Sequence, residues 1–196
     1  MLHQEDSSLV LKNPDRPSIL YRMDLEVGKV VDEWKVPGSI SIDSFGPRSK
    51  WAQTTREPTL LGLSHNSLFT LDPRLAQDKI VESQHQRYAS KVRFSAMATT
   101  QAGYVAVASE NGVIRLFDKV GVRAKATLPS LGEPITGLDV SANGRWILAT
   151  CKTYLLLVDV EHSDGKYKGE YGFKRSFSKE SKPRPKCLQL KYLQIF

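Results

Sequence analysis

The segment GYVAVASENGVIRLFD, residues 103–118, aligns with GRWILATCKTYLLLVD, residues 144–159, without a gap and at an offset of 41 residues. In both segments a glycine closes a turn, and six residues of strand character follow. A three-residue connection comes next, and a second strand then ends in a large apolar residue and an aspartate. Self-similarity at a fixed period of about 20–50 residues is the sequence pattern of repeat architectures. The first segment is therefore predicted to be one copy of a repeated unit and not an isolated hairpin.

A strand-like segment that ends in a large apolar residue and aspartate recurs four times at a near-constant spacing. The repeated residues are Asp24, Asp72, Asp118 and Asp159, spaced by 48, 46 and 41 residues. Asn-Gly dipeptides at 111–112 and 143–144 are typical of β-hairpin turns. Each aspartate is followed by another turn and another short strand, and a further strand opens the next unit. Four strands in about 40–45 residues is the pitch of a β-propeller blade.

The predicted fold class is all-β: a WD-repeat-like β-propeller with about four four-stranded blades. We expect a partial propeller that starts within a blade, because closed propellers of this type commonly need about seven blades. Alternate side chains of a strand point to opposite faces, and blades stack face to face, so both faces should be covered. Each repeated aspartate is expected to accept backbone N–H bonds in the turn that follows it. A β-sandwich is the main alternative, but it does not require the repeated endings.

The net charge of +7 lies entirely in the C-terminal part of the chain. Residues 166–196 carry nine Lys and Arg against two Glu, whereas residues 1–165 carry 19 basic and 19 acidic residues. We therefore divide the chain into propeller blades, residues 1–165, and a basic tail, residues 166–196, with either a last strand or the start of a next blade. A body without net charge argues against nucleic acid as the main partner, because electrostatically driven binding needs a basic patch on a folded face.

The composition indicates a folded protein of the cell interior. Hydrophobic residues make up 40% of the chain and charged residues 25%, as in proteins with a globular core. No stretch approaches about 18 uninterrupted apolar residues, so no membrane span is predicted. Cys151 lies in an apolar stretch and is interpreted as a small core residue. The predicted compartment is the cytoplasm, with the nucleus as the alternative.

Several longer segments resemble a known family. They are LYRMDLEVGKVVDEWKV (20–36), LGLSHNSLFTLDPR (61–74), residues 103–118, LGEPITGLDVSANGRWILATCKTYLLLVD (131–159) and KPRPKCLQL (182–190). They resemble the C-terminal WD-repeat-like domain of the vacuolar import and degradation (Vid) protein family, of the type of its twenty-seventh member. The resemblance implies a β-propeller at the end of a longer cytoplasmic protein, involved in vacuolar import and degradation of cytoplasmic proteins. We expect a non-enzymatic interaction scaffold, because rigid repeated sheets with variable loops present binding surfaces. The implied partners are other proteins and the remaining blades of a longer chain.

The sequence departs from the usual WD repeat in two dipeptides. The Gly-His that precedes an ordinary blade is absent, and Met, Leu, Phe or Val stands where tryptophan normally precedes the final aspartate. The hydrogen-bonded His–Ser–Trp network of standard WD blades therefore assigns no role to any residue of this chain.

No residue pattern predicts catalysis, a metal or a cofactor. None of the four histidines has a Cys or another His at zinc-ligand spacing, and the G-x-S-x-G motif of serine hydrolases is absent. Gly28 and Lys29 are interpreted as a hairpin turn, because no phosphate-binding glycine precedes them and no helix follows. The chain is therefore predicted to be a non-enzyme that uses no cofactor.

Trp51, in the loop GPRSKWAQ (46–53), is the predicted partner-binding residue, together with the basic residues Arg48 and Lys50 that precede it. An exposed aromatic side chain in a basic loop can anchor a partner. The alternative is that Trp51 covers the core beneath the loop. A second functional hypothesis is a nucleic-acid- or acidic-surface-binding protein that acts through residues 166–191 of the basic tail.

Overall fold

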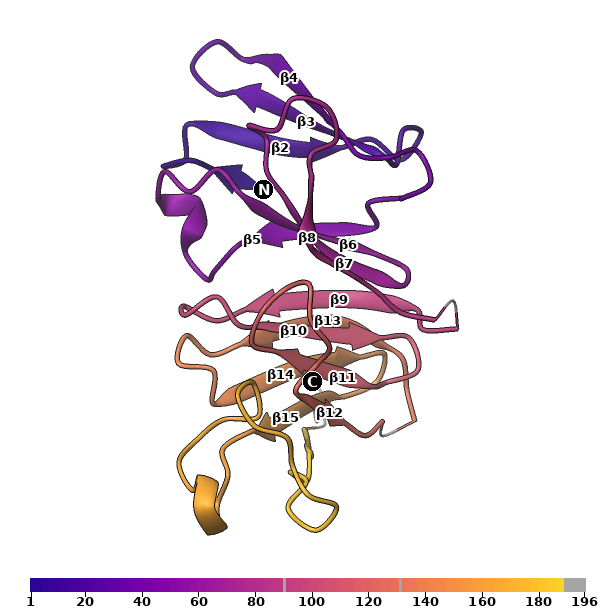
Figure 1. Cartoon of the computed structure of the whole chain (residues 1–196), viewed down its shortest axis with the longest axis vertical. Coiled ribbons are helices and arrows are strands. Elements are labelled where there is room, and N and C mark those ends of the chain that lie inside the picture. The colour runs from indigo at the N-terminus through magenta and orange to yellow at the C-terminus, as the bar shows by residue number, and fades with distance from the viewer. Residues whose placement is uncertain (90, 131, 189–196) are drawn as a thin grey trace, which may run out of the picture.

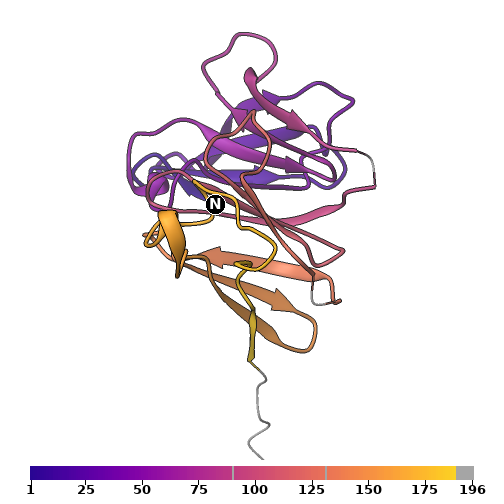
Figure 2. The same ribbon diagram turned by 60° about the horizontal axis from the view of Figure 1, so that its bottom comes forward.

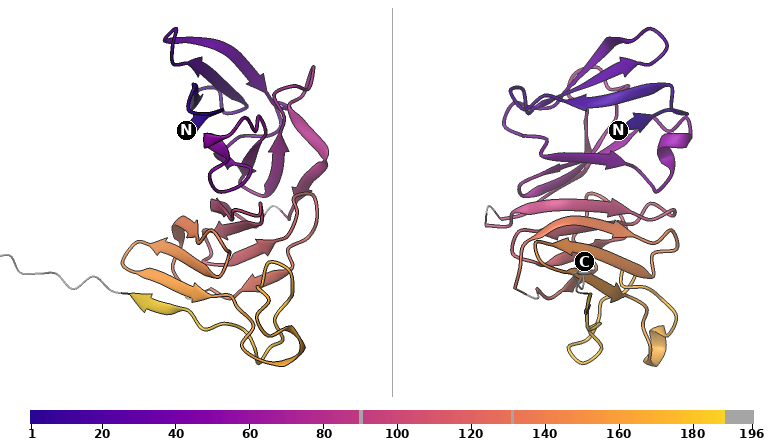
Figure 3. Two further views of the ribbon diagram at one scale, coloured as in Figure 1. Left: turned by 90° about the vertical axis from the view of Figure 1, so that its left-hand side faces the viewer. Right: turned by 180° about the vertical axis from the view of Figure 1, so that it is seen from behind.

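Four four-stranded antiparallel sheets, each formed by four consecutive strands, make up the computed structural model of the chain. The structure describes residues 1–89, 91–130 and 132–188. In Figure 1 the sheets follow one another from the indigo N-terminal sheet to the orange C-terminal sheet. The view in Figure 3 (left) shows that they are arranged along an arc. This is the blade-by-blade order that the repeat predicts.

The first two sheets contain strands β1 to β8. They are β1 (Leu2–His3), β2 (Ser8–Lys12), β3 (Ile19–Asp24) and β4 (Lys29–Lys35), followed by β5 (Ser44–Pro47), β6 (Leu60–Ser64), β7 (Ser67–Leu71) and β8 (Ile80–Arg87). In each sheet the order in space equals the order in sequence. A short 3₁₀ helix, η1 (Ala52–Thr54), lies in the long connection between β5 and β6.

The third and fourth sheets repeat this arrangement. Their strands are β9 (Phe94–Thr99), β10 (Val105–Ser109), β11 (Ile114–Phe117) and β12 (Ala126–Leu128), followed by β13 (Ile135–Val140), β14 (Trp146–Cys151), β15 (Leu155–Asp159) and β16 (Lys186–Leu188). The first strand of the third sheet, β9, lies beside both β5 and β13, so the first strands of the second, third and fourth sheets are neighbours. A second 3₁₀ helix, η2 (Gly165–Tyr167), follows β15. Neither of the two described helices has the length and hydropathy needed to cross a bilayer.

The two segments that align at an offset of 41 residues form the second and third strands of neighbouring sheets. In the third sheet Ala106 lies opposite Leu116, and in the fourth sheet Ala149 lies opposite Leu156. The turns at 111–112 and 143–144 fall between strands as predicted. The prediction of a repeated four-stranded unit is therefore confirmed, and the sandwich alternative is not.

Three of the four repeated aspartates organise the turn after the third strand. Asp24 Oδ1 accepts hydrogen bonds from the backbone N–H groups of Glu26 and Val27 at 2.9 and 3.0 Å. Asp72 and Asp159 each accept one from the residue two positions later, at 3.0 and 3.1 Å. Asp118 differs: its Oδ1 is buried without a hydrogen-bond partner, and its Oδ2 lies 3.4 Å from Lys125 Nζ. The aspartate accepts backbone N–H bonds in the following turn, as predicted, in three of the four repeats. In the third sheet Asp118 forms an ion pair instead.

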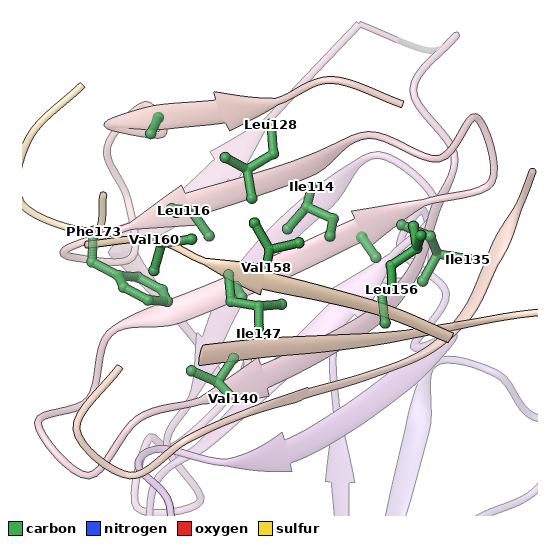
Figure 4. Close-up of a cluster of buried hydrophobic side chains, with 14 of the residues drawn as sticks. Ile114, Leu116, Leu128, Ile135, Val140, Ile147, Leu156, Val158, Val160 and Phe173 are labelled. Atoms are coloured by element: carbon green, nitrogen blue, oxygen red, sulfur yellow. The ribbon is translucent and has the colours of Figure 1, made fainter. Parts of the chain in front are cut away.

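Three apolar clusters fill the spaces between successive sheets. The first cluster includes Leu20, Trp34, Phe69 and Leu71, from the first and second sheets. The second includes Leu63, Leu68, Val107 and Phe117, from the second and third sheets. The third, shown in Figure 4, includes Leu116, Ile147, Val158 and Phe173, from the third and fourth sheets and the segment after β15. Burial of these side chains is what holds one sheet against the next.

Strand β11 is covered on both of its faces. Phe117 belongs to the cluster shared with the second sheet, whereas Ile114 and Leu116 belong to the cluster shared with the fourth. Each of the three side chains is at most 3% exposed. The expectation that blades cover both faces of their neighbours is confirmed for this sheet.

The first sheet has all four strands, where we expected the first copy to start within a blade. Strand β1 has only two residues, Leu2 and His3, which pair with Leu9 and Ser8. A run of two residues is too short to show the alternation that identifies a strand in a sequence. Its position is set by pairing with β2 and not by local pattern.

The folded body extends past residue 165, where we placed the boundary of the basic tail. Phe173 is fully buried against the third and fourth sheets and stacks on Tyr104 with ring centroids 5.8 Å apart. Strand β16 pairs with β15 as the last strand of the fourth sheet. In Figure 2 the segment between β15 and β16, orange to yellow, lies against the third and fourth sheets. The basic Lys191 lies outside the described residues.

Candidate interaction loop and cleft

The connection between β5 and β6 carries the predicted partner-binding residues. Residues 48–56 of this connection are called the bridging loop here. Trp51 is 53% exposed and has a left-handed backbone, with φ 76° and ψ 2°. Thr54 Oγ1 donates a hydrogen bond to the Trp51 carbonyl at 2.8 Å, which stabilises the turn. A left-handed conformation costs a non-glycine residue about 1–2 kcal/mol, so it persists only where surrounding contacts impose it. The structure therefore presents Trp51 to solvent and does not use it to cover the core.

Arg48 and Lys50 point to other blades. Arg48 Nη1 donates to the Gly103 carbonyl at 3.3 Å. Lys50 Nζ lies 2.7 Å from Asp139 Oδ1 and donates to the Val140 carbonyl at 2.6 Å. The backbone N–H of Lys50 also donates to the Thr100 carbonyl at 3.0 Å. These bonds tie the second sheet to the third and fourth, so the two basic residues support the loop while Trp51 faces outward.

The opposite end of the bridging loop contacts the first sheet. The backbone N–H of Glu5 donates to the Thr55 carbonyl at 3.1 Å, and Arg56 Nε lies 3.2 Å from Glu5 Oε1. Glu5 itself is in a left-handed turn with φ 56°. The loop that carries Trp51 is thus held by contacts to every sheet around it. A side chain on such a supported loop is presented in one orientation, which lowers the entropy lost on binding.

Replacing Lys50 with methionine is expected to lower the free energy of unfolding by about 1–2 kcal/mol, because hydrogen bonds from a charged group are lost at a largely buried position. Asp139 is exposed, so its own replacement by asparagine should cost less than about 1 kcal/mol. A double-mutant cycle from urea unfolding would measure the coupling. Arg56→Met is the control, since its ion pair with Glu5 is exposed and should be worth less than about 0.5 kcal/mol. Equal losses for Lys50→Met and Arg56→Met would contradict the bridging role.

A cleft of about 850 Å³ lies on the first-sheet side of β8 and is called the β8 cleft here. Three parts of the chain form it: the connection from β4 to β5, the turn between β6 and β7, and β8 with the loop before it. The lining residues include Ile40, His65, Ser67, Leu75, Asp78, Ile80, Glu82, His85 and Arg87. A second hollow of about 530 Å³ shares Ala76 and Gln77 with the cleft and continues along β4.

Two histidines, His85 in the β8 cleft and His3 in strand β1, have a pKa below the ordinary histidine value. Burial lowers the pKa of His85, and the nearby Arg87 charge lowers it further. Burial, with Arg22 as the second cause, also lowers the pKa of His3, which is 1% exposed and packs edge-on against Trp34. The Nε2 atoms of both rings are buried without hydrogen-bond partners. Protonating His85 would place a charge in a buried position beside Arg87. For His3, the Pro58 backbone and the Glu57 charge offset only part of the cost of burial.

The chain is therefore expected to lose stability as the pH falls below about 6.5, the ordinary histidine pKa. In that range His3 and His85 bind protons in the unfolded chain but stay neutral in the folded one. The free energy of unfolding therefore falls by at most about 1.4 kcal/mol per pH unit for each histidine. Urea unfolding across this range would measure the slope. The double variant His3→Gln, His85→Asn should flatten it, whereas His65→Asn, at an exposed position, should not. An unchanged slope in the double variant would show that other groups cause the acid sensitivity.

The remaining titratable groups bear on metal binding and on thiol chemistry. Among the described residues, no group of three or more His, Cys, Asp or Glu side chains could hold a metal ion. Burial raises the pKa of the Cys151 thiol, so the thiolate that a nucleophile requires is disfavoured. Cys187 is exposed and free.

The aromatic residues of the third and fourth sheets differ in burial. Phe117 is fully buried, but Trp146 and Tyr154 are half-buried, and Tyr154 precedes β15 instead of lying within it. The β8 cleft was missed because its residues are drawn from three connections that are far apart in sequence. The polar run SHNS (64–67) between two apolar strands was visible, but it indicates only a turn when taken alone.

Comparison with known proteins identifies both the family and the fold. A family model described as VID27 C-terminal WD40-like domain matches residues 1–195. Vacuolar import and degradation protein 27 of Schizosaccharomyces pombe is 53% identical over 190 residues, covering 97% of this chain and 24% of the relative. The protein of the same name from Saccharomyces cerevisiae is 43% identical over 178 residues, covering 90% and 23%. The chain thus spans about a quarter of the length of the curated relatives it matches.

Two solved structures share the fold at low sequence identity. The β-propeller domain of Myceliophteria thermophila Cps50 (Swd1) matches with a TM-score of 0.61 and 12% identity, over 84% of this chain and 52% of that one. The WD40 domain of Neurospora crassa Pan2 matches with a TM-score of 0.59 and 16% identity, over 81% and 45%. At these identities the likeness concerns the fold alone. This likeness, together with the four antiparallel sheets, confirms the predicted WD-repeat-like β-propeller class.

Proposed function

The chain belongs to the family of VID27 C-terminal WD40-like domains, and from this membership we propose that it is a non-enzymatic protein-interaction module. The observation that carries the proposal is the exposed Trp51 on a loop held by contacts to the surrounding sheets. A rigid set of sheets with binding residues on supported loops is the usual construction of an interaction scaffold. The partners are other proteins, and the compartment is the cytoplasm.

The process we propose is vacuolar import and degradation of cytoplasmic proteins. Its support is the name of the two relatives, which are 53% and 43% identical to this chain. The chain would contribute the surface that recognises other proteins, and the remainder of a longer polypeptide would contribute further steps.

The remaining blades of a longer chain are proposed as a second kind of partner. The outward face of the first sheet carries Leu9, Leu11, Ile19, Tyr21 and Met23, all half-buried. The outward face of the fourth sheet is also apolar, with Leu148 and Leu188 at 36% and 44% exposure. Sheet faces of this composition are normally covered by a neighbouring sheet. The matched propellers are about twice as long as the part that this chain covers, which is consistent with further blades at these faces.

The interaction proposal is tested by capture from a cytosolic extract with immobilised wild-type chain and Trp51→Ala. We expect proteins that the wild type retains to be recovered at least about threefold less by the variant, because a central aromatic anchor often contributes 1 kcal/mol or more. Val122→Ala is the matched control, since Val122 is 40% exposed on the connection between β11 and β12. Equal recovery by all three chains would contradict a role for the Trp51 surface.

Exposure of the basic tail supports the alternative hypothesis of an acidic-surface-binding protein. Lys179, Lys182 and Arg184 are all exposed, as a polyanion contact requires. Titration with heparin at several salt concentrations tests it. Affinity that falls steeply with salt and is lost on replacing these three residues with glutamine would favour this function over the first.

A further inference from the structure

The β8 cleft is lined by polar residues, one of which has a buried atom without a hydrogen-bond partner. His85 Nε2 is buried and has no hydrogen-bond partner. Ser67, 3% exposed, lines the same cleft, and His65 beside it is exposed. A buried nitrogen without a partner carries a free-energy cost in the free chain.

The charged residues of the cleft are separated along β8. Asp78 lies just before the strand, Glu82 lies within it, and Arg87 ends it, where it pairs with Ser67. All three side chains are exposed. Within residues 1–89, 91–130 and 132–188 none of them forms an ion pair. The acidic end and the basic end of the cleft therefore both face solvent, with the apolar Ile40, Leu75 and Ile80 also in the lining.

Strand β8 offers backbone groups as well as side chains. It is the last strand of the second sheet, so one edge has no neighbouring strand in that sheet. Its pairing with β7 is interrupted by a bulge, since Ile80 pairs with Leu71 and the next paired residue is His85. On the other side the bulge is covered, because Gly121 of the connection from β11 to β12 packs against Ser83. The cleft runs along this strand, with Ile80, Glu82, His85 and Arg87 in its lining.

We propose that the β8 cleft binds an extended segment of a partner polypeptide, about seven residues long. The segment would place a basic side chain at Asp78 and Glu82, branched apolar side chains over Ile40, Leu75 and Ile80, and an acidic side chain at Arg87. The eight residues of β8 span about 26 Å at 3.3 Å per residue, which sets the length. Strand-edge hydrogen bonds supply affinity in this mode, and side-chain contacts supply specificity.

The charge pattern favours polypeptide over a polyanion as the occupant. Two carboxylates against one guanidinium repel a phosphate backbone, whereas a peptide can carry both signs in the matching order. This inference rests on the proposed interaction function, because the ligand is part of another protein. The β8 cleft is, however, a different surface from the one that carries Trp51.

The test selects binding peptides from a phage-displayed library of random heptapeptides, with the full chain as the target. The recovered peptides are labelled with fluorescein, and their affinities are measured by fluorescence polarisation. We expect selected peptides with the predicted order of charges and affinities on the order of 100 µM or tighter. Arg87→Glu should weaken them at least about tenfold, and replacing the acidic peptide residue with lysine should restore binding to that variant. Glu82→Lys should weaken binding in the same way.

Two control variants separate this inference from the proposed function. Arg123→Glu changes an exposed arginine outside the cleft and should leave peptide affinity unchanged, as should Trp51→Ala. Selected peptides whose affinity does not depend on Arg87 and Glu82, or a selection that enriches no peptide, would overturn the cleft assignment. If those results were obtained while capture from the extract still depended on Trp51, the proposed interaction function would be supported and only the β8 cleft proposal would be rejected.

Discussion

Replacing Phe117 with alanine is expected to lower the free energy of unfolding by about 3–5 kcal/mol, the range for truncating a buried phenylalanine. Phe117 is fully buried at the end of β11 and belongs to the cluster that joins the second and third sheets. Its ring packs edge-on against Tyr88, with centroids 6.2 Å apart. The neighbouring strands are paired on both sides, so the cavity left by the ring cannot collapse easily. A loss of this size is a large share of the stability of an ordinary domain.

Equilibrium urea unfolding, followed by circular dichroism and tryptophan fluorescence, would measure the change. Trp51→Ala is the control, because an exposed side chain away from the core should change stability by less than about 0.5 kcal/mol. If Phe117→Ala were as stable as Trp51→Ala, the second and third sheets would not be held together by this cluster.

Replacing Gly121 with alanine should cost about 2–4 kcal/mol, for two reasons that act together. Gly121 has φ 89°, in a region where an alanine costs about 1–2 kcal/mol. A Cβ at this position would also overlap the Ser83 carbonyl oxygen and lie 2.9 Å from the Cα of Gln84. These are backbone atoms of the bulged strand β8 and cannot rotate away as a side chain can. The connection from β11 to β12 would therefore have to separate from the second sheet.

Gly28→Ala separates the conformational cost from the steric one. Gly28 has φ 70°, but an added Cβ would meet nothing within 4 Å. This variant should lose only about 1–2 kcal/mol. Thermal and urea unfolding of both variants would give the comparison, and equal losses would show that close packing against β8 contributes nothing. Because Gly121 supports the far side of the β8 bulge, Gly121→Ala should also weaken the peptides selected on the β8 cleft.

The repeat was readable from the sequence because it depends on local chemistry. Apolar runs of strand length, Asn-Gly turns and the recurring aspartate each act within a few residues, and three of the four aspartates make the predicted turn bonds. Asp118 follows the same pattern in sequence but pairs with Lys125, because that choice depends on which side chain lies beside it in the fold. Strand β1 was missed for the same reason, since two residues carry no pattern.

The candidate sites show how far such local information reaches. The loop of Trp51 was selected from its composition alone, and its tryptophan is exposed. The roles of Arg48 and Lys50 were not predictable, because their bonds reach Gly103 and Asp139, 55 and 89 residues away in sequence. The β8 cleft is likewise assembled from three separate connections, and the order of its charges emerges only along the folded strand.

The sequence by itself determined the all-β class and the four-stranded unit of this protein, because strand pattern and turn chemistry are local and repeat along the chain. The family came from the resemblance of longer segments to known ones. The tertiary structure alone decided which basic residues support the loop, that Phe173 joins the core, and that opposite charges line one cleft. Those features arise from contacts between residues far apart in sequence, and only the stacking of one sheet on the next brings these residues together.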